Sequence, residues 1–293
     1  MKNDIEILDC TFRDGGYYNN WNFNNNIIQD YITDLNKLNI KFIEIGFRTF
    51  EDTTSKGETG YSRDRFINKL KVPKNIFLGV MINASDLISK NNDPLEKCKQ
   101  MFANRVNSKI KFIRFACHFH EIFYLKKTIS WLKKNDLKVF INVMQISEIS
   151  KKKVKEICNF LKFTRIDGIY LADSLGSLNP QRTKNLVKTF KTHWKHDLGF
   201  HAHNNLGLAM KNALAANNNG VKWIDCTLMG MGRGPGNLLT EDIIKYLKVK
   251  NSKSLFKKKV VNYFFNLKKK YKWGPNKYYA IAAKNKIHPT YIQ

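Results

Sequence analysis

Short apolar runs alternate with longer amphipathic segments through most of this 293-residue chain. Eight of the runs have the length and the β-branched or aromatic content of buried strands. A strand buried on both faces of a parallel sheet reads as a continuous apolar run, and a helix must carry the chain back to the start of the next strand. The runs are 5–8, 42–45, 76–81, 112–115, 139–143, 168–171, 198–201 and 223–227.

This alternation predicts an α/β fold, a (β/α)₈ TIM barrel with a C-terminal helical extension. A doubly wound open sheet is the alternative, but its usual six or so strands would leave two units over. Helical patterns are expected at 27–38, 121–134, 147–162, 180–192 and 206–217. The alternation stops after residue 247, and 254–270 and 277–286 read as further helices. We therefore predict a barrel domain over 1–248 and a helical extension over 249–293.

Composition favours a globular protein, with 43% hydrophobic residues and 13% aromatic residues. No apolar run reaches the roughly 18 residues of a membrane span, and the first residues lack the apolar segment of a secretory signal. Five cysteines are dispersed without a Cys-x-x-Cys pair, which indicates reduced thiols rather than disulfides or a zinc site. We expect a cytoplasmic protein with no membrane span.

The chain is strongly basic, because 51 Lys and Arg residues face 24 Asp and Glu residues and give a net charge of +27. Such a charge would suit nucleic acid or another anionic surface. The lysines lie mostly in the expected helices and loops, next to asparagine runs, as is typical of a solvated surface. Nucleic acid is therefore not expected as a partner.

Charged and imidazole side chains follow directly after several of the apolar runs, where the active site of a TIM barrel lies. Asp9 to Gly16 follow the first run, His201 and His203 close the seventh, and a glycine-rich loop at 230–237 follows the eighth. Residues i and i+2 of a strand share a face, so the two imidazoles project together. They lack only an oxygen ligand to form a divalent-metal site.

Three motifs in this order resemble the DRE-TIM metallolyase superfamily, and most of all its 4-hydroxy-2-oxovalerate aldolase and hydroxymethylglutaryl-CoA lyase-like branch. They are Asp-x-Thr-x-Arg-Asp-Gly at 9–15, His-x-His at 201–203, and Gly-x-Gly-x-Gly-x-Gly-Asn at 230–237. The resemblance implies a carbon–carbon lyase, a divalent-metal-dependent aldolase that acts through a metal-bound, pyruvate-type enolate. It would cleave a 4-hydroxy-2-oxo acid to pyruvate and an aldehyde, or join the two.

Carried over to this chain, the resemblance makes Asp14, His201 and His203 the metal ligands, with Asn237 as a further ligand or a positioning residue. One carboxylate and two imidazoles suit Mn²⁺, which we expect, or Mg²⁺, Co²⁺ or Zn²⁺. These ions would leave open positions for a 2-oxo acid and water.

Arg13, Tyr17 and Glu44 are the predicted catalytic residues. Arg13 would face the developing enolate oxygen, and Glu44 would orient Arg13 or hold a metal-bound water. Glu44 lies within an apolar run, so it needs a partner if it is buried. The oxovalerate aldolases carry a histidine three residues after the metal aspartate, where this chain has Tyr17. Proton transfer would fall to Tyr17, to a metal-bound hydroxide, or to His288 or Tyr291.

The barrel rule also places four substrate-binding candidates at the mouth, namely Arg48, Arg114, His118 and Ser174. Either arginine could bind a substrate carboxylate through two parallel hydrogen bonds. A structural salt bridge is the alternative for each.

Two other functions stay open. One is an acyl-CoA/2-oxo acid condensing synthase of the isopropylmalate or homocitrate type, and the other is a catalytically inactive basic binding protein on the same barrel. The resemblance implies a small-molecule 2-oxo acid substrate. It is also compatible with a homo-oligomer or an aldehyde-processing partner.

Overall fold

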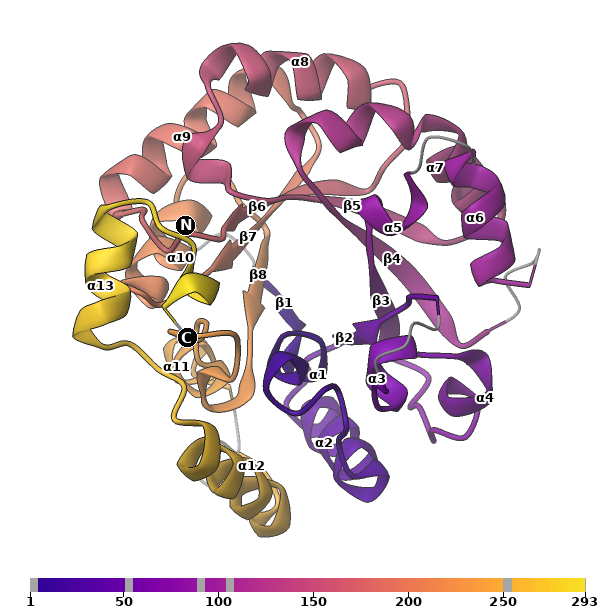
Figure 1. Cartoon of the computed structure of the whole chain (residues 1–293), viewed down its shortest axis with the longest axis vertical. Helices are drawn as coiled ribbons and strands as arrows, with labels where there is room; N and C mark the ends of the chain where they lie inside the picture. The colour runs from indigo at the N-terminus through magenta and orange to yellow at the C-terminus, as the bar shows by residue number, and fades with distance from the viewer. Residues whose placement is uncertain (1–4, 51–54, 89–92, 104–107, 250–254, 293) are drawn as a thin grey trace.

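Eight parallel strands pair in sequence order, and β8 pairs with β1 to close a barrel (Figure 1). The computed structural model describes residues 5–50, 55–88, 93–103, 108–249 and 255–292. The predicted TIM barrel is confirmed. Its strands are β1 (Glu6–Asp9), β2 (Phe42–Phe47), β3 (Phe77–Asn83), β4 (Ile110–Cys117), β5 (Lys138–Val143), β6 (Gly168–Asp173), β7 (Asp197–Ala202) and β8 (Trp223–Cys226).

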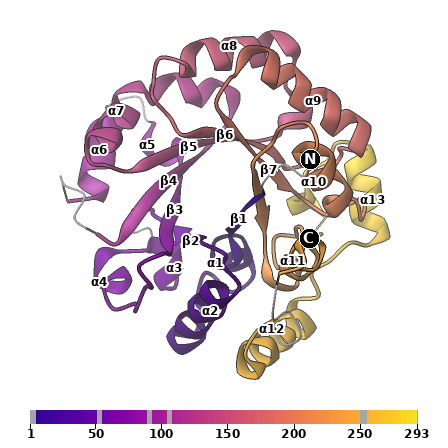
Figure 2. The same ribbon diagram turned by 180° about the vertical axis from the view of Figure 1, so that it is seen from behind.

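Helices surround the barrel on the outside (Figures 1 and 2). Within the described residues, no helix is both long and apolar enough to cross a membrane. The α-helices are α1 (Thr11–Asp14), α2 (Asn25–Lys37), α3 (Glu58–Tyr61), α4 (Asp64–Ile67), α5 (Ala84–Leu87), α6 (Pro94–Met101), α7 (Lys126–Lys134), α8 (Lys151–Leu161), α9 (Pro180–His193), α10 (Ala209–Asn217), α11 (Thr240–Leu247), α12 (Lys258–Tyr271) and α13 (Lys277–Lys284). Short 3₁₀ helices are η1 (Gly15–Tyr18), η2 (Phe119–Tyr124), η3 (Ile146–Glu148), η4 (Leu228–Gly230) and η6 (Pro289–Tyr291).

Three of the predicted helices begin several residues later in the structure than the sequence pattern indicated. The segment expected at 121–134 is divided into η2 and α7, and the one expected at 147–162 into η3 and α8. The side chain of Ser150 accepts a hydrogen bond from the amide of Lys153 and starts α8 as a new helix. The helix expected at 206–217 begins only at Ala209, whose amide donates to the side chain of Asn204. A side-chain cap, which periodicity does not report, sets the start of α8, whereas α7 and α10 begin without a side-chain N-cap.

Two layers of side chains fill the barrel interior around the site. The lower layer is apolar and mostly aromatic, and consists of Leu8, Cys10, Phe42, Phe112, Phe140, Tyr170 and Trp223. Glu44, Arg114 and Asp225 each lie two residues beyond a member of that layer, so their side chains share its face of the strand. The barrel therefore carries a charged layer directly above an apolar floor.

The C-terminal helices pack onto the barrel as predicted. Helix α12 lies beside α2 in both views (Figures 1 and 2). Its Phe264 is fully buried against Phe12 and Tyr31, with ring centroids 6.2 Å and 5.9 Å away. The expected helices at 254–270 and 277–286 are found at Lys258–Tyr271 and Lys277–Lys284, and residue 254 lies outside the described residues. The domain boundary at 248 stays a prediction.

If α12 is part of the barrel's own core, Phe264→Ala should lower the free energy of unfolding by about 3–5 kcal/mol, because it leaves a cavity against α1 and α2. The adjacent Phe265, which is half-exposed, provides a matched control, and Phe265→Ala should change stability by less than about 0.5 kcal/mol. Urea unfolding followed by circular dichroism measures both. Equal effects of the two substitutions would show that α12 does not share the core.

Candidate functional site

A hydrogen-bonded carboxylate at the end of β1 holds the turn that carries Arg13 and Asp14. Asp9 Oδ1 accepts from the amide of Thr11 at 3.1 Å, and Asp9 Oδ2 accepts from the hydroxyl of Tyr31 at 2.6 Å. The hydroxyl of Thr11 in turn accepts from the amide of Leu228 at 2.9 Å. The loop after β1 is thereby joined to the loop after β8, on the two neighbouring strands that close the barrel.

The end of β7 is aligned with the glycine-rich loop by backbone pairing. His203 and Asn237 face each other in an antiparallel bridge, and the amide of Leu238 donates to the carbonyl of Ala202 at 3.2 Å. Gly236 has a φ of +73°, and a Cβ there would stand 2.3 Å from the carbonyl oxygen of Gly230. Only glycine fits this turn, which returns the chain so that Asn237 reaches the site.

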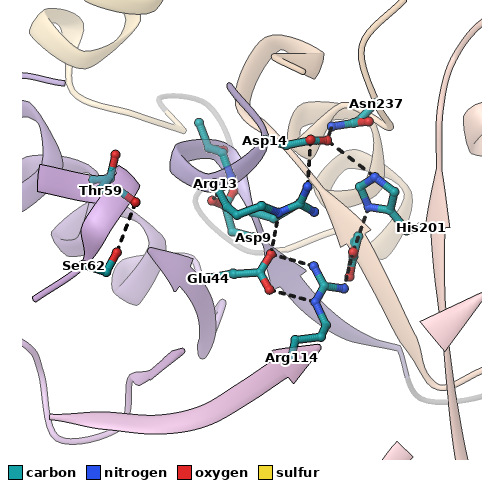
Figure 3. A network of polar contacts seen from close by, with 12 residues as sticks. Asp9, Arg13, Asp14, Glu44, Thr59, Ser62, Arg114, His201 and Asn237 are labelled. Carbon is teal, nitrogen blue, oxygen red and sulfur yellow. Dashed lines mark hydrogen bonds and ion pairs between the residues drawn. The ribbon is translucent and has the colours of Figure 1, made fainter. Parts of the chain in front are cut away.

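Asp14, His201 and His203 bring one carboxylate and two imidazoles together. Their potential ligand atoms all lie within 4.8 Å of one another, and His201 Nε2 is 3.4 Å from Asp14 Oδ2 (Figure 3). The side chain of Asn237 donates to Asp14 Oδ2. The four residues predicted as ligands from the sequence are thus brought together.

The donor set fits a divalent cation. All four side chains are buried. His203 Nδ1 and Asn237 Oδ1 have no hydrogen-bond partner within the described residues, although buried polar atoms are almost always paired. A Cβ on Gly232 would stand 2.4 Å from Asn237 Nδ2, so the loop backbone closes directly over the cluster. Nitrogen and oxygen donors with open lone pairs are what such a cation requires.

Beneath these donors runs a closed ring of buried ion pairs (Figure 3). Arg13 bridges Asp14 and Glu44, with both hydrogen bonds at 2.7 Å. Arg114 donates to both oxygens of Glu44, at 2.8 and 2.7 Å, and to Asp225 at 2.5 Å. The ring returns to Asp14 through His201, whose Nδ1 lies 2.8 Å from Asp225 Oδ2. The partner that a buried Glu44 needs is therefore confirmed, and there are two.

The ring shifts the pKa values of the donors in different directions. Burial alone would raise the pKa of Asp14, but Arg13 and the two histidines hold it well below its usual value. Burial opposes a charge on His201 as well, yet its hydrogen bonds to Asp14 and Asp225 hold its pKa above the usual value. Burial and the neighbouring His201 hold the pKa of His203 well below its usual value. His203 is thus neutral and presents a free lone pair.

Asp225 is a functional residue that the sequence reasoning did not single out. It is buried in β8 and contacts both His201 and Arg114. By accepting from His201 Nδ1, it directs Nε2 towards Asp14, as the second carboxylate partners of metal-bound histidines do. The sequence did contain a signal for this residue, because Asp225 is a charged residue within an apolar strand, as Glu44 is.

Comparison with known proteins shows the family of the chain. The HMGL-like family matches residues 4–267, which is most of the chain. The chain belongs to the HMGL-like family. The family membership predicted from the three motifs is confirmed.

Several relatives of this chain have names that state a reaction. 4-Hydroxy-2-oxovalerate aldolase 4 from Rhodococcus opacus is 34% identical over 136 residues, which are 46% of this chain and 39% of that protein. 4-Hydroxy-2-oxovalerate aldolase from Carboxydothermus hydrogenoformans is 28% identical over 250 residues, 84% of this chain and 71% of the relative. Oxaloacetate decarboxylase from Mycobacterium tuberculosis is 24% identical over 243 residues, 82% and 69% of the two chains. The match to the Rhodococcus opacus relative spans about two fifths of that protein's length.

Solved structures share the HMGL-like barrel. The N-terminal domain of a candidate aldolase from Bacteroides vulgatus superposes with a TM-score of 0.83 at 29% identity, over 98% of this chain and 95% of that one. The HMG-CoA lyase of Bacillus subtilis has a TM-score of 0.72 at 16% identity, over 96% and 99% of the two chains. The relatives are named for aldolase and decarboxylase reactions, so the chain is a member of an enzyme family of the lyase kind.

The structure does not bring the two substrate-binding arginines to the mouth of the HMGL-like barrel. Arg114 is fully buried beneath the metal donors, and its guanidinium lies 4.5 Å from the centre of the Tyr170 ring. Arg48 pairs with Asp64 at 2.7 Å and stacks on Phe102, away from the donors. Both are engaged in ion pairs, and a substrate role for either stays a prediction.

The other mouth candidates lie at the C-terminal ends of their strands. Ser174 follows β6, and its hydroxyl accepts from the amide of Gln145 at 3.0 Å. His118 follows β4, and its ring lies parallel to that of His120 with centroids 6.1 Å apart. Their substrate-binding roles stay predictions.

Tyr17 lies at the edge of the site, against aromatic neighbours. Its ring packs edge-on to Trp21 and Phe47, at centroid distances of 4.9 and 6.1 Å. These three rings, with Asn83 and other residues, line a cleft of about 80 Å³. Part of the Tyr17 ring is exposed, yet desolvation raises the pKa of its hydroxyl. The phenol therefore keeps its proton at neutral pH.

Asp225→Asn should weaken Mn²⁺ binding about 10- to 100-fold, as loss of the second partner of a metal-bound histidine does. The substitution removes the charge that orients His201 and leaves Arg114 with one carboxylate partner fewer. Isothermal titration calorimetry with Mn²⁺ measures the affinity. Asp242→Asn on the exposed face of α11 is the matched control. Unchanged affinity in Asp225→Asn would contradict the assigned role.

The free energy of unfolding should depend on pH through Asp9, and the pKa shift of its carboxyl group gives the direction of that dependence. Burial outweighs its hydrogen bonds and raises the pKa of Asp9 to about 6, against about 4 in an unfolded chain. Its protonated form is favoured by folding, so its contribution to stability is full below pH about 4 and is lost as pH rises through about 6.

The free energy of unfolding of the wild type relative to Asp9→Asn should therefore fall by up to about 3 kcal/mol between pH 4 and 7. Urea titrations at a series of pH values measure this difference. Asp242→Asn controls for the loss of one carboxylate. A difference that stays constant over the range would show that Asp9 does not titrate there.

Proposed function

We propose that this chain is a divalent-metal-dependent aldolase that makes or breaks the carbon–carbon bond between a pyruvate-type enolate and an aldehyde. The observation that carries the proposal is the placement of Arg13. Its guanidinium is held by Asp14 and Glu44 at 2.7 Å each, directly beside the metal donors. A fixed cation next to a metal site is suited to an oxygen that becomes negative during the reaction.

Asp14, His201 and His203 would hold the cation, with Asn237 beside them, and our proposal for the ion is Mn²⁺, with Mg²⁺, Co²⁺ or Zn²⁺ as alternatives. When bound, such an ion supplies Lewis-acid polarisation of the 2-oxo acid. Asp225 and Arg114 act beneath it by keeping His201 and Glu44 in place.

Arg13 is preorganised for its role. Within the described residues its Nε and Nη1 are taken by Glu44 and Asp14, which leaves Nη2 for the substrate. The guanidinium is almost fully buried, so its charge is little screened by water. It would stabilise the enolate oxygen without moving during the reaction.

Tyr17 is the proposed proton-transfer residue. It lies three residues after Asp14 and lines the small cleft formed with Trp21 and Phe47. Because its phenol stays protonated, it would donate a proton to the enolate carbon during cleavage. The proton that leaves the 4-hydroxyl group of the substrate would restore the phenol, and in the direction of synthesis the same transfers would run in reverse.

Decarboxylation of oxaloacetate is a second candidate, favoured by the relative of that name. Loss of carbon dioxide from oxaloacetate leaves the enolate of pyruvate, so Arg13 would serve both reactions alike. The aldol reaction is preferred because the more similar relatives are named aldolases.

The proposal includes a small-molecule 2-oxo acid as substrate and a cytoplasmic location. All five cysteines are buried and unpaired, as in proteins of reducing compartments. A homo-oligomer or an aldehyde-processing partner stays part of the proposal.

With Mn²⁺ present, the protein should release pyruvate from 4-hydroxy-2-oxo acids, and His201→Ala should lower the rate at least 100-fold because it removes a metal donor. Lactate dehydrogenase coupling measures pyruvate, and oxaloacetate in the same assay tests the second candidate. His196→Ala, a change of the same kind on the surface, is the control. If the wild type and His201→Ala are equally inert towards both substrate classes but bind Mn²⁺, the site binds metal without this chemistry.

A further inference from the structure

The glycine-rich loop carries an arginine without a counter-ion. Within the described residues Arg233 forms no ion pair, whereas Arg13, Arg48 and Arg114 each contact a carboxylate. Its Nε is buried and has no hydrogen-bond partner. A partly buried guanidinium with an unpaired donor is unfavourable unless something binds to it.

The one printed hydrogen bond of Arg233 does not neutralise its charge. Its Nη2 lies 3.0 Å from Nε2 of His288, near the C-terminus. Burial, together with the charge of Arg233 and the nearby His118, lowers the pKa of His288 to about 4. His288 is therefore neutral at physiological pH, and it accepts from Arg233 without supplying a negative charge.

Arg233 lies on the outer side of the metal donors. Its guanidinium carbon is 5.1 Å from the centre of the Tyr17 ring, and the preceding Gly232 is in contact with Asp14, where a Cβ would be 3.2 Å from Oδ2. Arg13 lies deeper, in the buried ring. A substrate whose 2-oxo acid end is at the metal donors and Arg13 would therefore extend towards Arg233.

The loop that presents Arg233 is held firmly by the C-terminal segment. The carbonyl of Gly234 accepts from the hydroxyl of Tyr18 and from the amide of Gly274, each at 3.2 Å. A Cβ on Gly234 would meet the ring of Tyr279 at 3.0 Å and Pro289 at 3.2 Å.

The same C-terminal segment reaches across the rim of the barrel. Lys286 pairs with Glu148, after β5, at 3.0 Å. The segment thus spans from the β8 side to the β5 side. Arg233 and His288 are held in a fixed arrangement rather than on a free loop.

We propose that Arg233, supported by His288, is the subsite for an oxyanion on the aldehyde half of the substrate. The acceptor would be an aldehyde that carries a carboxylate or a phosphate, not a neutral aldehyde. This rests on the proposed aldolase function. In the reaction pyruvate loses a methyl proton, its methyl carbon bonds to the aldehyde carbonyl carbon, and the carbonyl oxygen takes up a proton.

Two measurements on the full chain with Mn²⁺ test the proposal in sequence. The first is exchange of the methyl protons of pyruvate in D₂O, followed by NMR without aldehyde, which reports enolate formation alone. The second is kcat/KM for matched aldehydes, namely succinic semialdehyde against butanal, and glyceraldehyde 3-phosphate against glyceraldehyde. The two pairs distinguish a carboxylate ligand from a phosphate ligand.

We expect one anionic aldehyde to be preferred over its neutral partner by about 10- to 100-fold, the size of one charge-assisted hydrogen-bonding group. Arg233→Met should reduce that ratio to below about threefold. Arg233→Lys keeps the charge but loses the planar fork, and should retain an intermediate ratio. Arg65→Met, a matched change at an exposed arginine of α4, should keep the wild-type ratio.

His288 is a positioning residue, and its variants have a separate signature. His288→Leu removes the acceptor for Arg233 and should raise KM for the anionic aldehyde more than it lowers kcat. His288→Gln, which can still accept from Arg233, should restore part of the affinity.

Each negative result would contradict a different part of the proposal. Absence of methyl exchange in the wild type would overturn the proposed function. Exchange with equal kcat/KM for both members of both pairs would overturn only the anion subsite. A rise in KM for pyruvate exchange in Arg233→Met, without a change in the aldehyde ratio, would assign Arg233 to the carboxylate of pyruvate and also overturn the subsite.

Discussion

The buried ring of ion pairs is the constraint on which the rest of the site depends. Glu44, which is fully buried, would be very unfavourable as a lone charge, since desolvation costs several kcal/mol per ion. It is compensated because Arg13 and Arg114 both bind it, and each arginine reaches a second carboxylate, Asp14 or Asp225. Removing one member would leave an unpaired charge and cost about 3–5 kcal/mol. The ring therefore specifies one arrangement of the metal donors more than it adds to stability.

The barrel and the shared face of the two histidines were predictable because each depends on a short-range pattern, whereas the choice of Asp14 as the third metal donor came from the family resemblance. Continuous apolar runs define the strands, and the strand period of two makes His201 and His203 share a face. The fold then brings Asp14 to them, since active-site residues follow the strands at one rim. The need of a buried Glu44 for a partner was also readable. The first residues of the helices were harder to predict, because a cap such as Ser150 acts through a single hydrogen bond.

Residues that act across the barrel were not predictable from the same patterns. Arg114 was expected at the mouth as a ligand for substrate, but strand β4 continues beyond it and leaves it a layer lower. Asp225 was passed over as part of a strand, and its contact with His201 depends on the order of strands around the barrel. Arg48 follows its strand as the rule requires, yet its side chain turns to Asp64, the first residue of α4. Position along a strand predicts the rim but not the direction in which a long side chain points.

The two parts of the site differ in what holds them. The metal donors and Arg13 rest on strands and the first turn after them, where the barrel core and the ion-pair ring fix their positions. Arg233 and His288 rest on a loop and a C-terminal segment that meet at Gly234. Loops tolerate sequence change far better than the strands that carry them. A chain of this fold can therefore keep the chemistry of the enolate while the loop and the C-terminal segment select the second reactant. Arg233 is therefore the part of the site that indicates which aldehyde is the substrate. The ion-pair ring beneath it does not.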